Sequence, residues 1–97
     1  MCRPDIAQDY LERARDHIQQ GDKNNALILL KIAQSYIDDC AEQSIITLGA
    51  PLRECIITLQ KDNPNYSNAL ILLDNAQSNL SIMIIQQFKE WIDLNRT

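Results

Sequence analysis

Glycine, aromatic residues and histidine are scarce in this chain of 97 residues, and valine is missing. Two glycines cannot build the glycine-rich loop that cradles a phosphate group, and one histidine cannot serve a site that needs two imidazoles. The sequence also contains neither a GxSxG nor an HExxH motif. We therefore expect a protein that is not an enzyme and that takes neither a cofactor nor a small-molecule substrate.

Excess positive charge and long apolar runs are also lacking. Nine basic residues against thirteen acidic ones give a net charge of −4, which argues against a basic surface for nucleic acid or anionic lipid. No apolar run approaches the roughly 20 residues of a membrane span. The N-terminal residues carry charges where the apolar region of a signal peptide would begin. These features predict a cytoplasmic protein without nucleic-acid or membrane partners.

The cysteine pattern predicts neither a disulfide framework nor a metal site. Cys2, Cys40 and Cys55 are odd in number, and no pair has CxxC spacing. One histidine and three scattered thiols offer too few ligands for a structural metal. We expect Cys40 and Cys55 to be small buried residues in a reducing compartment.

Isoleucine and leucine supply most of the apolar residues. The 14 Ile and 12 Leu, with aromatics at only 5%, are typical of cores built by helix packing. The length suits one domain, which we take as residues 1–97. A domain of this size buries only about 65% of its unfolded surface, so oligomerisation is plausible from size alone.

An internal repeat at a shift of 43 residues is the strongest pattern in the chain. Residues 25–30 (NALILL) return as residues 68–73, and residues 33–35 (AQS) return as residues 76–78, so nine of eleven positions match. Repeats with a period of 20 to 50 residues usually indicate stacked supersecondary units.

The first copy predicts a helical hairpin over about 4–48. Pro4 suits the first turn of one helix, and Gly21-Asp22 separates it from a second helix that Asn24 or Asn25 can cap. Apolar residues at helical spacing mark the buried faces of the two helices: Ala7, Leu11, Ala14 and Ile18, then Ala26, Leu30, Ala33, Ile37, Cys40 and Ala41.

The second copy predicts another hairpin over about 51–95. Pro51 suits the start of a third helix, residues 62–65 form a turn, and Ser67 can cap a fourth helix. The third helix has an apolar stripe of Leu52, Cys55, Ile56 and Leu59. The expected fold is all-α, with four helices arranged as two αα-hairpins.

The region between the hairpins permits two interpretations. The tetrad IITL occurs at residues 45–48 and again at residues 56–59. Both copies are rich in β-branched residues and flank Gly49-Ala50-Pro51, so a β-hairpin is possible. We favour helix, because the apolar residues do not alternate.

The first hairpin resembles a tetratricopeptide repeat. Gly21-Asp22 followed by Ala26, Leu30 and Ala33 matches the turn and the small–large–small positions of that family, and Tyr10 and Ala14 fit its first helix. The sequence departs from the pattern at Arg13, His17, Asp38 and Pro64, whereas Tyr66, Ala69, Leu73 and Ala76 of the second copy match it. The resemblance implies a protein-binding scaffold. Since the chain has room for two repeats only, it predicts either a closed four-helix bundle or self-association.

His17 is the one residue with a catalytic interpretation. A histidine four residues before Gly21 on an acidic helical bundle resembles a histidine-phosphotransfer domain, although Gln20 stands where that family usually has lysine. The resemblance implies that His17 accepts a phosphoryl group. The alternative, which we favour, is a half-buried packing residue beside Tyr10 and Ala14.

The fourth helix has more apolar surface than one face can hold. One stripe comprises Leu80, Ile84, Phe88 and Trp91, and a second comprises Ile82, Ile85 and Ile92. A helix that is apolar on more than one face must be covered on more than one face. We therefore predict an interface at Ile82, Ile85, Phe88, Trp91 and Ile92, with the alternative that this is the central core helix.

Three functions remain open at this point. The first is a helical protein–protein interaction module, acting as a small adaptor or a homodimer, whose partner is another protein or a second copy. The second is a small acidic inhibitor or immunity-type protein that blocks a basic partner. The third is phosphotransfer through His17.

Overall fold

The computed structural model describes residues 3–38 and 50–94, which form four α-helices. The helices are α1 (Pro4–Gln19), α2 (Lys23–Asp38), α4 (Ala50–Gln60) and α5 (Tyr66–Leu94). No strand occurs within these two ranges, so the prediction of an all-α fold is confirmed. Residues 56–59 are helical, whereas the first IITL tetrad, Cys40 and Ala41 lie outside the described residues.

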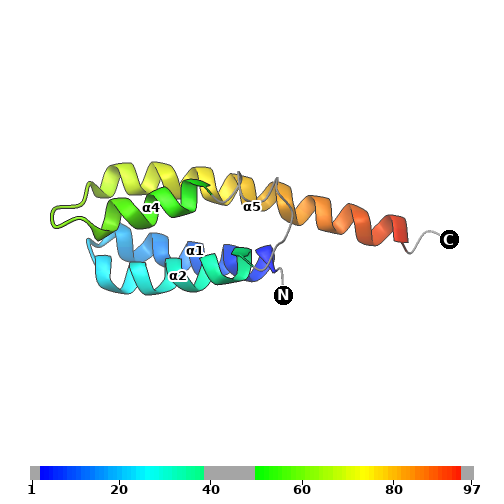
Figure 1. Ribbon diagram of the computed structural model, residues 1–97, viewed down its shortest axis with the longest axis horizontal. Helices are drawn as coiled ribbons and strands as arrows, with labels where there is room; N and C mark the ends of the chain where they lie inside the picture. The colour runs from blue at the N-terminus through cyan, green and yellow to red at the C-terminus, as the bar shows by residue number, and fades with distance from the viewer. Residues whose placement is uncertain (1–2, 39–49, 95–97) are drawn as a thin grey trace.

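The helices form a four-membered bundle. α1 packs against α2 and α4 against α5 as antiparallel hairpins, and the hairpins meet through α1 with α5 and α2 with α4 (Figure 1). Each helix therefore has two neighbours around a shared core. The molecule measures 54 × 23 × 20 Å. Its length comes from α5, whose 29 residues span about 43 Å, against about 24 Å for the 16 residues of α1.

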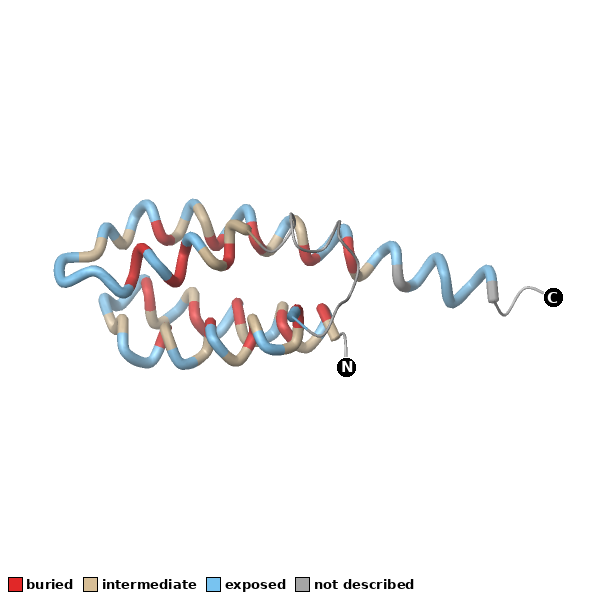
Figure 2. The backbone as a smooth tube through the Cα atoms, in the orientation of Figure 1, coloured by how far each residue is buried: buried red, intermediate tan, exposed pale blue. Residues whose placement is uncertain are grey.

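The core uses one small–large–small–large pattern on three helices. The spacing of four, three and four residues places these side chains on one helix face, and the alanines let neighbouring backbones approach closely. All twelve are buried: Ala7, Leu11, Ala14 and Ile18; Ala26, Leu30, Ala33 and Ile37; Ala69, Leu73, Ala76 and Leu80. α4 completes the core with its predicted stripe of Leu52, Cys55, Ile56 and Leu59 (Figure 2). The predicted buried faces are confirmed wherever the structure describes them.

The turn between α1 and α2 is a Schellman motif. Gly21 has φ +75°, a conformation that glycine adopts without the steric cost of a Cβ. The Gly21 N–H donates to the carbonyl of Ile18 at 3.0 Å, and the Asp22 N–H donates to the carbonyl of His17 at 2.8 Å. These are the two bonds by which this motif satisfies the last carbonyls of a helix.

The predicted helix caps are wrong by a few residues. The side chain of Asp22, not Asn24 or Asn25, caps α2, with Asp22 Oδ1 3.4 Å from the Asn25 N–H. At α5, Asn65 Oδ1 accepts the Asn68 N–H at 3.0 Å, in place of the predicted Ser67. The Schellman turn ends at Asp22, whose N–H still bonds back to α1, and α2 begins at the next residue, so the cap position falls on Asp22.

Candidate interaction surface

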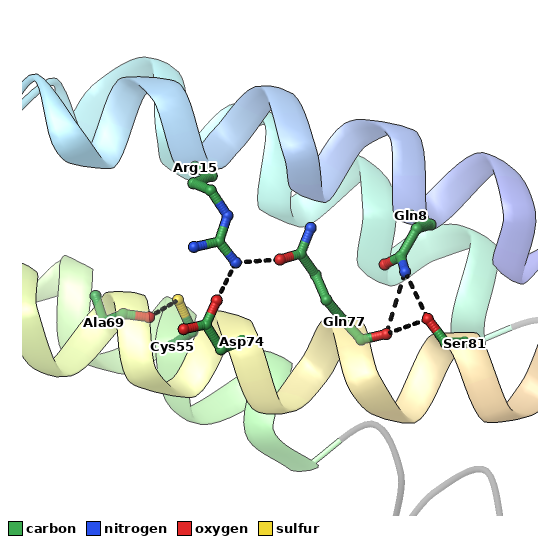
Figure 3. A network of polar contacts seen from close by, with 7 residues as sticks. All are labelled: Gln8, Arg15, Cys55, Ala69, Asp74, Gln77 and Ser81. Carbon is green, nitrogen blue, oxygen red and sulfur yellow. Dashed lines mark hydrogen bonds and ion pairs between the residues drawn. The ribbon is translucent and has the colours of Figure 1, made fainter.

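α1 and α5 are joined by polar contacts that fix them antiparallel. Gln8 Nε2 donates to Ser81 Oγ and to the carbonyl of Gln77, both at 3.1 Å. Seven residues later on α1, Arg15 contacts the side chains of Asp74 and Gln77 (Figure 3). As the α1 residue number rises from 8 to 15, its α5 partner falls from 81 to 74. This network was not anticipated, because nothing local in the sequence pairs residues some 60 to 70 positions apart.

The face of α5 that meets α1 is a continuous stripe with two different halves. Its residues are spaced by three or four positions and so share one face: Asp74, Gln77, Ser81, Ile85, Phe88 and Ile92. The first three are polar and contact α1. The last three are apolar and are exposed by 54, 59 and 38%. The stripe thus changes from polar to apolar along the helix.

The change occurs where α1 begins. Pro4 is the first residue of α1, one turn before Gln8, and the antiparallel packing therefore places it level with Ile85, one turn after Ser81. The Arg3 N–H donates to the carbonyl of Tyr36 at 3.4 Å, so α2 ends close to the same level. Among the α5 residues whose burial the structure describes, Met83 is the last that is buried, and the helix continues to Leu94 beyond the level of Pro4, the first residue of α1 (Figures 1 and 2). We call residues 84–94 the tail.

The predicted interface residues are exposed apolar side chains on and beside the tail. Phe88 and Trp91 stack with ring centroids 6.1 Å apart. We call the whole set the α5 patch: Ile82 (48% exposed), Ile85, Phe88, Trp91 (60%) and Ile92. Leu80, which the sequence places on the same stripes, is buried in the core instead. The bundle therefore uses one stripe of α5 up to Met83 and leaves the α5 patch exposed.

Three further exposed isoleucines do not form a surface of this kind. Ile28, Ile57 and Ile71 are each more than half exposed, and they lie on α2, α4 and α5. Single apolar residues on a surface are ordinary in folded proteins. Ile71 is nevertheless useful as a control, because it lies on α5 but away from the α5 patch.

His17 lies in the last turn of α1, and its side chain is about one-third exposed. Its Nδ1 is 3.2 Å from Asp22 Oδ2. Gly21 lies in the turn after α1, not on the helix itself. Hydrogen bonds from the Asn25 side chain and N–H, with a smaller effect of His17, lower the pKa of Asp22. Asp22 is a partner of His17 that sequence reasoning missed.

Residues 3–38 and 50–94 contain no group of three or more His, Cys, Asp or Glu side chains placed to hold a metal ion. None of the helices in these ranges is long and apolar enough to cross a membrane.

Comparison with known proteins gives no relative. No family model matches the chain, and no curated protein or solved structure matches it. The resemblances to a tetratricopeptide hairpin and to a phosphotransfer domain therefore stay interpretations of the sequence.

Proposed function

We propose that this chain is a non-enzymatic helical protein–protein interaction module, a small adaptor or homodimer that binds its partner through the α5 patch. One observation carries the proposal: the α1-facing stripe of α5 is polar where α1 covers it and apolar beyond Pro4, the first residue of α1. A helix end with no function in binding would be expected to become more polar outside the bundle, because exposed apolar side chains gain nothing from water.

The composition of the α5 patch also supports this function. The α5 patch contains two stacked aromatic rings, Phe88 and Trp91, together with three isoleucines. Aromatic side chains bury large areas and often act as the anchors of interfaces. Side chains at spacings of three and four are the usual means by which a helix packs into a groove or against another helix.

The same proposal places the module in the cytoplasm, with no cofactor. Cys55 is a free, fully buried thiol whose Sγ lies 3.4 Å from the carbonyl of Ala69 (Figure 3). A small buried residue of this kind suits a reducing compartment, where thiols stay unpaired.

A matched pair of variants tests the proposal. Ile85→Glu places a charge in the α5 patch, and Ile71→Glu places one on the same helix at a similarly exposed position outside the patch. We expect both variants to keep the helicity of the wild type. The partner is either a differently tagged second copy or another protein, which is purified and then bound again to each variant. Ile85→Glu should lose this binding, and Ile71→Glu should keep it. Equal binding by the two variants would contradict the proposal.

The acidic inhibitor remains a second candidate because of a different surface. Asp5, Asp9, Glu12 and Asp16 are all exposed and follow one another on the outer face of α1. Two of them are paired with neighbouring arginines, at 2.8 Å for Arg3–Asp5 and 3.1 Å for Arg13–Asp9. A basic partner on this face would be released by salt, and its affinity would be unchanged by Ile85→Glu. A partner on the α5 patch should show the opposite behaviour.

A further inference from the structure

We draw no further inference here: the strongest candidate, the exposed α5 patch on and beside the last turns of α5, carries none because nothing in residues 3–38 and 50–94 shows what covers it.

Discussion

His17 and Asp22 are linked twice across the turn that ends α1. The His17 carbonyl accepts the Asp22 N–H at 2.8 Å, and His17 Nδ1 lies 3.2 Å from Asp22 Oδ2. Schellman motifs commonly carry an apolar contact between these two positions, and here a polar pair takes its place. The same aspartate caps α2, with its second contact to Asn25 Nδ2 at 2.7 Å. One side chain therefore serves the end of one helix and the start of the next.

Removing this side chain should weaken the first hairpin. Asp22→Ala loses the cap of α2 and the contact with His17 together, and we expect the melting temperature to fall by about 5 °C. Asn65→Ala, which removes the corresponding cap of α5, should lower it by a similar or smaller amount. Asp62→Ala is the control, because Asp62 is an exposed carboxylate in the other turn. Thermal melts followed by circular dichroism measure all three, and an Asp22→Ala melt equal to that of Asp62→Ala would refute the capping role.

The stability contributed by Asp22 should be lost in acid. The pKa of Asp22 in the folded protein lies below its ordinary value of 3.8, first because of the Asn25 side chain. A carboxylate with a lowered folded pKa stabilises the fold above its unfolded pKa, and this contribution disappears as the pH falls through the folded value. Asp22→Asn keeps a capping side chain but cannot ionise.

The comparison of these two proteins isolates the charge. At pH about 6 the wild type should melt at a higher temperature than Asp22→Asn, and the difference should shrink toward zero by pH about 2. Asp5, whose pKa is also lowered, mainly by its hydrogen bond with Arg3, is present in both proteins and cancels. A difference that does not change with pH would mean that the charge of Asp22 does not contribute.

Gly21 should tolerate asparagine better than alanine. A Cβ at this position would meet no atom within 4 Å, so the cost of a side chain comes only from the φ of +75°. Gly21→Ala should lower the free energy of unfolding by about 1 kcal/mol, and Gly21→Asn by less, because asparagine adopts left-handed backbone more readily. Denaturation in urea gives both values. A stabilising Gly21→Ala, as occurs where φ is negative, would contradict the geometry of this turn.

Cys55 should be nearly inert in the folded protein. Burial raises the pKa of its thiol to about 11, and only the thiolate reacts with thiol reagents. In a Cys2→Ser, Cys40→Ser background at pH 8, we expect a reagent such as dithionitrobenzoate to label Cys55 at least about a hundredfold more slowly in buffer than in denaturant. Labelling at the same rate in both solutions would show that this part of the core opens freely.

Those properties of the fold that depend on neighbouring residues could be predicted from the sequence. The stripe from Ala7 to Ile18 and its counterpart from Ala26 to Ile37 are repeated at helical spacing, and both are buried. The caps were harder to predict, since Asp22, Asn24, Asn25 and Ser67 are all favourable at such positions. At α2 the choice depends on where the preceding turn ends, which is set by the conformation of Gly21.

The candidate site could also be predicted from the sequence only in part. That its residues lie outside the core could be predicted, because the helix has more apolar stripes than one buried face can hold. Its position beyond the bundle could not, because it depends on where Pro4 lies along α5. That level is set by the register of Gln8 and Arg15 against Ser81 and Asp74, which arises only when the whole bundle is assembled.

The length of α5 beyond its neighbours divides the helix into two thermodynamic halves. Residues 66–83 pack in the core, so their amide hydrogens should exchange with solvent only when the whole bundle unfolds. Residues 84–94 extend an existing helix and need no new nucleation, but in a single chain they can fray one turn at a time. Under the proposed function, their exchange rates should therefore fall when a partner binds the α5 patch. One continuous helix would then record two equilibria, folding in its first half and association in its second.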